Sequence, residues 1–171
     1  MIRKTWLFLG VAFAGCSGID VSEDYDRNQD FARLRTWAWA PPVPQADGSG
    51  YSEISSLTHK RITSAVEGEM MRKMYQKTEP NRADFWVRHY ASTGQKLEAY
   101  PGYNGWYGEG DELAVVEEGT IVVDFVSPKD KRLLWRGKAT SVIDESMTPE
   151  ERENRIDESV QKILEQFPPK R

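Results

Sequence analysis

Hydrophobic and polar residues alternate with a period of two in several segments of the chain, which predicts strands that bury one face. The alternation is clearest over residues 120–126 and 133–143, where every second side chain is apolar or small. Residues 127–130 lie between them, with Pro128 at the second position of a turn, and this arrangement favours a hairpin. The same period predicts further strands over residues 31–40, 83–92 and 95–100.

Two longer segments carry apolar residues at helical spacing. The first runs from Ser52 to about Tyr75. The second begins with the N-cap Thr148, and the glutamate of a capping box, Glu151, follows three residues later. Ser159 lies on the flank that we expect to face solvent. The apolar residues of the second helix fall within a stripe of roughly 100° and comprise Ile156, Val160, Ile163, Leu164 and Phe167.

The order of these elements predicts an α+β fold, a mixed α/β layer. We expect a mixed β-sheet of about four to six strands, with two long helices covering one face. If the strands at 31–40 and 83–92 pair through the first helix, they should be parallel, with a right-handed crossover.

The first sixteen residues have the layout of an export signal. Basic residues 3–4 precede an apolar stretch over 6–14, which is too short to span a membrane as a helix of about 20 residues. Phe-Ala-Gly (13–15) then stands directly before Cys16, as in a bacterial lipobox. The thiol of Cys16, the only cysteine in the chain, is the nucleophile that accepts a diacylglyceryl group. The alternative is an ordinary cleaved signal followed by an incidental cysteine.

The chain therefore divides into a lipoprotein signal peptide over residues 1–15, a lipidated tether over 16–23 and a single domain over 24–171. Two or three acyl chains, such as palmitate, hold a protein stably at a membrane. Ser17 follows the cysteine, whereas Asp at that position retains lipoproteins of enterobacteria in the inner membrane. By similarity, we expect an anchor in the outer membrane, facing the periplasm.

Composition limits the possible partners and cofactors. A length of 171 residues suits one domain, and one cysteine excludes an internal disulfide framework and a cysteine-rich zinc site. A net charge of −4 argues against nucleic acid as the main partner, because nucleic acid requires a clustered basic surface.

No catalytic motif is recognisable in the sequence. His89 could act as a base, and Asp84 and Asp124 could face each other, but local structural roles account for all three residues. The acidic residues at 24–30 fit no register of an EF-hand loop. We therefore expect no enzymatic activity and no metal, and no cofactor other than the covalent diacylglyceryl lipid on Cys16.

One segment has the composition of a recognition loop. Residues 101–110 contain four glycines and three large aromatic side chains, Tyr103, Trp106 and Tyr107, and Tyr100 directly precedes them. Aromatic residues on loops contact sugars, lipid head groups or proteins. The alternative is a hairpin tip whose rings pack onto the sheet.

Six short motifs follow one another along the chain. They are Asp24-Tyr25-Asp26, Asp30-Phe31 with Thr36-Trp37-Ala38-Trp39, Ala83-Asp84-Phe85-Trp86-Val87, Glu118-Gly119-Thr120-Ile121-Val122-Val123-Asp124, Leu134-Trp135-Arg136-Gly137 and Phe167-Pro168-Pro169. In this order they resemble a family of bacterial lipoproteins, Domain of Unknown Function 4136. The resemblance covers residues from about 19 to 169 and implies a lipoprotein that faces the periplasm, without implying an activity.

Together these observations favour a non-enzymatic, membrane-anchored envelope lipoprotein that binds or scaffolds another envelope component, most simply an envelope protein. The alternative is a binder of a small amphiphile or glycan through the aromatic loop at 101–110. A hydrolase-like enzyme is the third possibility. A scaffold should expose an apolar patch and have no deep pocket, whereas a ligand binder should contain a concave pocket lined by aromatic side chains with a few polar groups.

The lipobox generates a direct prediction. Cys16→Ala removes the nucleophile, so the variant should accumulate as a precursor that no longer incorporates labelled fatty acid. Intact-mass measurement of the wild-type protein checks the same point. An unmodified mass that begins at any residue other than Cys16 would contradict the prediction.

Overall fold

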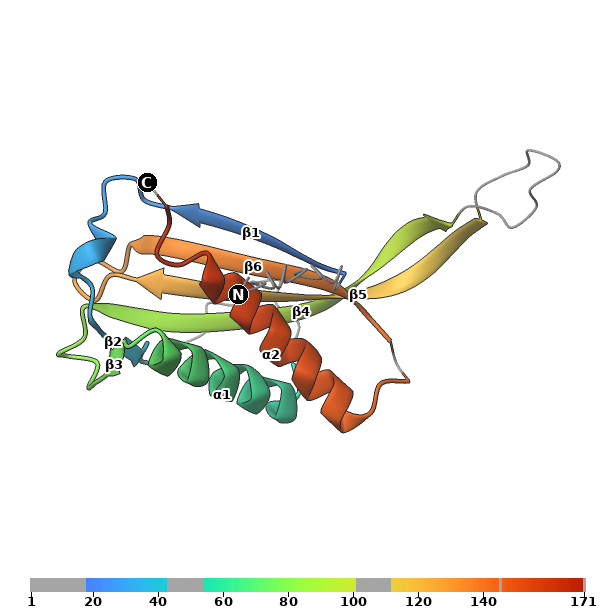
Figure 1. Ribbon diagram of the computed structural model, residues 1–171, viewed down its shortest axis with the longest axis horizontal. Helices are drawn as coiled ribbons and strands as arrows, with labels where there is room; N and C mark the ends of the chain where they lie inside the picture. The colour runs from blue at the N-terminus through green and yellow to red at the C-terminus, as the bar shows by residue number, and fades with distance from the viewer. Residues whose placement is uncertain (1–17, 43–53, 101–111, 145, 171) are drawn as a thin grey trace, which may run out of the picture.

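In the part of the chain that the structure describes, six strands form one mixed sheet, and two α-helices cover one of its faces (Figure 1). The computed structural model describes residues 18–42, 54–100, 112–144 and 146–170. The fold is therefore of the α+β class, as the sequence predicts. The elements are β1 (Ile19–Tyr25), a short 3₁₀ helix (Phe31–Arg33), β2 (Thr36–Trp39), α1 (Ser56–Arg72), β3 (Gln76–Lys77), β4 (Phe85–Tyr100), β5 (Glu112–Val126), β6 (Leu133–Ile143) and α2 (Pro149–Glu165).

The strands lie in the order β1-β6-β5-β4-β2-β3. β2 pairs in parallel with β4, so the predicted parallel pairing of these two strands is confirmed. β2 also pairs in parallel with β3, and the remaining neighbours are antiparallel. The predicted β5–β6 hairpin is present, and its turn is closed by a hydrogen bond from Ser127 N–H to the Arg132 carbonyl at 2.9 Å.

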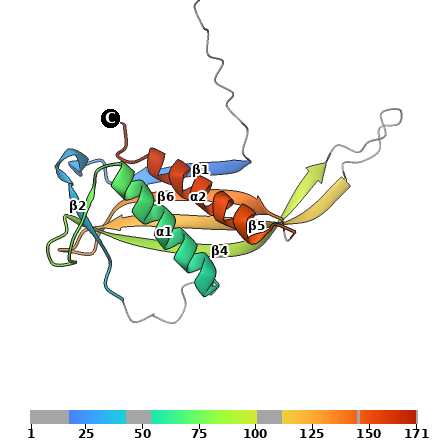
Figure 2. The same ribbon diagram turned by 60° about the horizontal axis from the view of Figure 1, so that its bottom comes forward.

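β4 and β5 are longer than the sequence pattern predicts. The two strands expected at 83–92 and 95–100 are one strand, because pairing with β5 continues in register through Gly94 and its partner Glu118. β5 likewise begins at Glu112, well before the expected start at residue 120. The two strands therefore project beyond the rest of the sheet (Figures 1 and 2).

The pattern predicts neither β1 nor β3. β1 pairs with β6 from Ile19 onward, so residues 19–23, which we expected to belong to the tether over 16–23, form part of the sheet. Among the seven residues of β1 only Ile19 is buried. Apolar side chains alternate at Ile19 and Val21, but the charged Glu23 interrupts the pattern before Tyr25. The interruption weakens the alternation on which strand prediction depends.

Local capping sets where both helices begin. The Ser55 side chain accepts a hydrogen bond from the Thr58 backbone N–H, so α1 begins four residues later than the pattern suggests. Thr148 and Glu151 form the predicted capping box of α2, with both reciprocal hydrogen bonds present. The two helices lie side by side over the strands (Figure 2).

The core lies between the helices and the sheet. The predicted stripe of α2 is confirmed at Val160, Ile163 and Leu164, which are fully buried. Ser159 does not face solvent as expected, because it is only 3% exposed. Its hydroxyl donates to the Arg155 carbonyl at 2.8 Å, which allows the small polar side chain to turn inward.

Gly137 in β6 permits the close approach of α2 to the sheet. A Cβ atom at this position would lie 2.5 Å from Ile163 Cγ2 and against the Trp135 indole. Both neighbouring side chains are fully buried and cannot move aside without disturbing other core contacts. The residue is therefore required for packing.

We predict opposite effects for two glycine substitutions. Gly137→Ala should lower the free energy of unfolding by about 1–3 kcal/mol, because the methyl group overfills the core. Gly68→Ala, within α1, meets no atom within 4 Å and should raise it by about 0.5–1 kcal/mol. Urea denaturation of the two variants checks both values. Equal free energies of unfolding for the two variants would show that the packing of α2 on the sheet does not require glycine at position 137.

Candidate functional site

The three residues considered for catalysis lie apart. His89 faces α1, and Asp124 lies on the neighbouring strand with its side chain on the opposite face of the sheet. Asp84 precedes β4 and accepts hydrogen bonds from the backbone N–H groups of Arg35 and Thr36, at 2.9 and 2.8 Å. Although partial burial opposes the shift, these hydrogen bonds lower the pKa of Asp84. The structure therefore does not assemble a catalytic group from these residues.

His89 is a partly buried histidine between the sheet and α1. Its Nε2 lies 3.2 Å from the Thr63 hydroxyl, and its ring centroid lies 4.4 Å from that of His59. Among the described residues, its Nδ1 is buried without a hydrogen-bond partner. Burial, and to a smaller extent the neighbouring His59, lowers the pKa of His89 to about 4. The side chain is therefore neutral at pH 7.

A row of alternating charges crosses the face of the sheet opposite the helices. The register places Asp24, Arg136, Asp124 and Arg88 next to one another on β1, β6, β5 and β4. Arg136 donates two hydrogen bonds to the Asp124 carboxylate, both of 2.6 Å. This bidentate pairing satisfies the buried carboxylate and gives Asp124 a structural role.

The candidate recognition residues and the lipidation site fall mostly outside the described residues. This is the case for Cys16, Tyr103, Trp106 and Tyr107. Tyr100 is the last residue of β4, but its side chain is not among those described. Residues 101–111 connect β4 and β5 in the chain.

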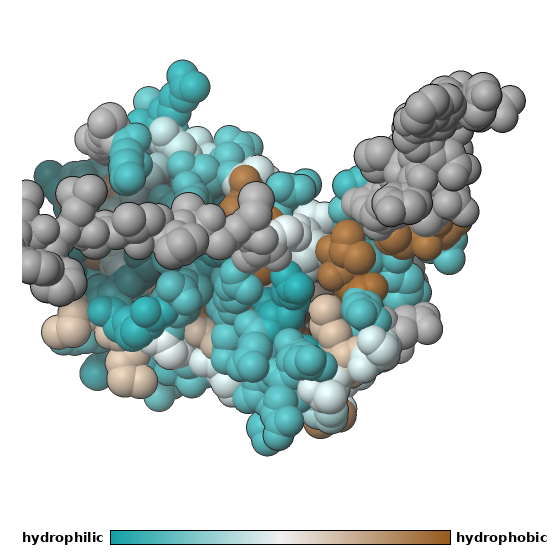
Figure 3. Space-filling view, turned by 45° about the vertical axis from the view of Figure 1, so that its right-hand side comes forward, coloured by the Kyte–Doolittle hydropathy of each residue, from teal (hydrophilic) through white to brown (hydrophobic). Residues whose placement is uncertain are grey.

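We call residues 96–100 and 112–116 the hairpin arm. Within the described chain these residues pair only with each other, because pairing of β5 with β6 ends at Glu117. Leu97 and Val115 are cross-strand partners in the arm, and they are 65% and 62% exposed. Apolar surface gathers at the base of the arm and along its underside (Figure 3). Two large apolar side chains thus stand together in solvent.

A pocket lies at the base of the arm, between the first turns of both helices and strands β4 to β6. Its volume is about 430 Å³, within the range of small-molecule sites. Its apolar lining comprises Ile54, Leu57, Ala91, Ile121, Ala139, Val142, Ile143, Met147 and Ile156. The sequence does not reveal this site, because its walls come from five separate elements and the lining residues that the structure describes contain no aromatic ring.

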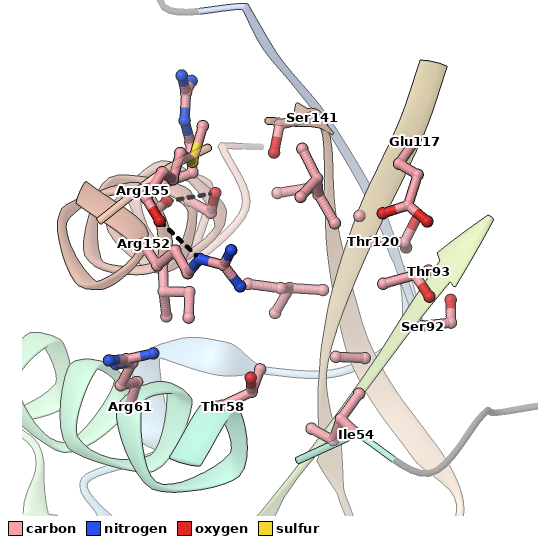
Figure 4. Close-up of a pocket in the computed structure, with 18 of the residues that line it drawn as sticks. Ile54, Thr58, Arg61, Ser92, Thr93, Glu117, Thr120, Ser141, Arg152 and Arg155 are labelled. Atoms are coloured by element: carbon pink, nitrogen blue, oxygen red, sulfur yellow. Dashed lines mark hydrogen bonds between the residues drawn. The ribbon is translucent and has the colours of Figure 1, made fainter. Parts of the chain in front are cut away.

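Three arginines also line the pocket: Arg61 from α1, and Arg152 and Arg155 from α2. Arg152 Nε donates to the Met147 carbonyl at 3.1 Å, and Arg61 lies on the same side of the pocket (Figure 4). Thr93 and Glu117 lie on the strand side. The only signal in the sequence is the spacing of Arg152 and Arg155, because residues three apart lie on one face of a helix.

Two further findings concern metals and membranes. In residues 18–42, 54–100, 112–144 and 146–170, no cluster of three or more His, Cys, Asp or Glu side chains could hold a metal ion. In the same residues, no helix has the length and apolar character needed to cross a membrane.

Comparison with known proteins gives a family and a fold. A family model described as "Domain of unknown function (DUF4136)" matches residues 21–169. A DUF4136 family protein from Bacteroides thetaiotaomicron is similar in structure, with a TM-score of 0.54 and 16% sequence identity over 88% of this chain and 96% of its own. No curated protein matches the chain.

A second similar structure is a PDZ domain protein from Parabacteroides distasonis. The TM-score is 0.54 and the sequence identity is 12%, over 90% of this chain and 37% of that protein. This chain therefore spans little more than a third of that relative. At such identities both similarities concern the fold alone.

The environment of His89 predicts acid sensitivity. In the unfolded chain the histidine has a pKa near 6.5 and is protonated below that pH, whereas in the folded protein His89 becomes protonated only near pH 4. Stability should therefore fall as the pH decreases from 6.5 towards 4, by about 2 kcal/mol between pH 7 and pH 5. His89→Gln should lose most of this dependence, whereas His59→Gln should retain it, because burial is the larger cause. Urea denaturation at the two pH values checks this. An identical pH dependence in wild type and His89→Gln would exclude His89 as its origin.

Proposed function

We propose a function from the surface of this chain, because the chain belongs to the DUF4136 family, whose function is unknown. The protein is a non-enzymatic domain that binds another envelope component through the hairpin arm. The component that we favour is an envelope protein. The domain would be held at the membrane by a lipid on Cys16, in the outer membrane and facing the periplasm.

The exposed pair Leu97 and Val115 carries this proposal. A two-stranded hairpin without a third strand is at best marginally stable in water. A sequence under no further constraint would place polar residues on both faces of such an arm, since exposed apolar side chains favour aggregation. Paired apolar residues at this position are accounted for by a partner that covers them.

The position of the ionisable residues supports the non-enzymatic part of the proposal. Asp124 is paired with Arg136, and Asp84 caps the loop before β2. His89 lies under α1, in contact with Thr63 and His59. Each residue thus has a structural role in its own place.

A second candidate function uses the aromatic segment at 101–110. This segment joins the two strands of the hairpin arm, so the chain brings it to the same end of the domain as Leu97 and Val115. A glycan or a small amphiphile bound there would also be recognised at this end. The two functions differ in the chemical nature of the captured component.

Crosslinking from the arm tests the proposal. A photoreactive amino acid in place of Leu97, in the full-length protein in intact cells, should give a discrete protein adduct upon irradiation. In a second experiment the photoreactive amino acid is placed at another position of the arm. There the protein adduct should form in the wild-type background and should be lost when Leu97→Lys and Val115→Lys are introduced together. The same double variant should change the free energy of unfolding by less than about 0.5 kcal/mol, because both side chains are exposed.

Met71 provides the matched control, since it is 72% exposed on α1 and distant from the arm in sequence and fold. The same photoreactive group at Met71 should give no such adduct. Identical adducts from both positions would contradict the proposal. An adduct with a lipid or glycan alone would favour the second candidate function.

A further inference from the structure

We infer that the pocket at the base of the arm binds one single-chain amphiphile with an anionic head group, a fatty acid being the simplest example. The inference deepens the proposed function and rests on its membrane anchor for the source of the ligand. The arm would contact the partner, and the pocket would hold the lipid. These are separate surfaces that can be tested separately.

The walls of the pocket suit an acyl chain. Ile121, Ile143 and Ile156 project from β5, β6 and α2, and Ala91 and Ala139 form part of the sheet wall. Burial of apolar surface is worth about 25 cal/mol per Å², so a flexible aliphatic chain gains affinity without requiring polar contacts. The absence of aromatic side chains from the described lining fits an aliphatic chain better than a sugar, which stacks on rings.

The charges around the pocket suit an anionic head. Three arginines line it, against one acidic side chain in the described lining, Glu117. Arg61 also forms a salt bridge with Glu153, which does not line the pocket; Nε of Arg61 lies 3.9 Å from Oε2 of Glu153. Guanidinium groups bind carboxylates with two parallel hydrogen bonds, and they do so best next to apolar surface. The guanidinium groups on this side of the pocket would therefore favour an anionic head over a cationic one.

The chain places the pocket close to the expected lipid anchor. Ile19, the first residue of β1, pairs with Ser141, and Ser141 lines the pocket. Two residues, Ser17 and Gly18, separate Cys16 from Ile19, and the three residue-to-residue steps between them extend at most about 11 Å. A lipid on Cys16 would therefore hold the pocket near the membrane surface, where single-chain lipids are available.

A photoreactive laurate analogue tests the inference. The full-length protein is irradiated with the analogue below its critical micelle concentration, and the labelled residue is located by mass spectrometry. We expect one label per chain, on residues that line the pocket. Unmodified laurate should compete for labelling, whereas the dodecyltrimethylammonium ion, which has the same chain with a cationic head, should compete at least tenfold less well.

Two variants separate the head from the chain. Arg152→Gln should weaken competition by laurate about tenfold, and Lys138→Gln, which removes one positive charge from another exposed site, should not. Leu57→Asp places a negative charge in the lining at a side chain that is 63% exposed, and it should abolish labelling of the pocket. Met71→Asp on the same helix should have no effect.

Several outcomes would overturn the inference. These are the absence of label from the pocket, labelling confined to residues 1–16, equal competition by the cationic amphiphile, or labelling unchanged by both Arg152→Gln and Leu57→Asp. None of them bears on the adduct expected from Leu97, because that experiment reports on the arm. Conversely, loss of the Leu97 adduct would leave the lipid site intact.

Discussion

The packing of one ring, Phe167, fixes the arrangement of the layers. Phe167 follows α2 and contacts five other rings, with centroid distances from 4.6 to 6.1 Å: Phe31, Tyr75, Phe85, Phe125 and Trp135. Its carbonyl also accepts a hydrogen bond from Lys73 at the end of α1. The C-terminal ends of both helices are thereby held on the sheet by a single cluster. Their N-terminal ends have no equivalent cluster among the described residues, and the pocket lies there.

Much of this fold follows from the sequence, because local signals determine it. The capping box at Thr148, the turn at Pro128 and the alternation in β6 each depend on neighbouring residues, and each is confirmed. β1 is not predictable in this way, because its pairing with β6 comes from residues more than a hundred positions apart. Ser159 shows a related failure, since its inward orientation depends on a hydrogen bond to its own helix and on the shape of the pocket.

The candidate site is less predictable than the fold for a physical reason. Ion pairs such as Arg136 with Asp124, and hydrogen bonds such as those to Asp84, depend on register between strands. The sequence identifies these carboxylates as candidates but not their partners, which determine their role. The pocket is even more difficult to predict from the sequence, because Arg61 and Arg152 belong to different helices that only the packed core brings together.

The continuity of β4 and β5 gives one pair of strands two levels of local stability. Val87 and Val123 are fully buried beneath the helices, so we expect the backbone hydrogen bonds there to break only when the whole domain unfolds. Beyond residue 96 the same ladder has solvent on both sides, and it can open without disturbing the core. In native-state hydrogen exchange, amides of the core part of each strand should therefore exchange through global unfolding, and amides of the arm should exchange through local opening. A ligand that contacts only the arm would order the free end of this ladder, with little effect on the melting of the domain.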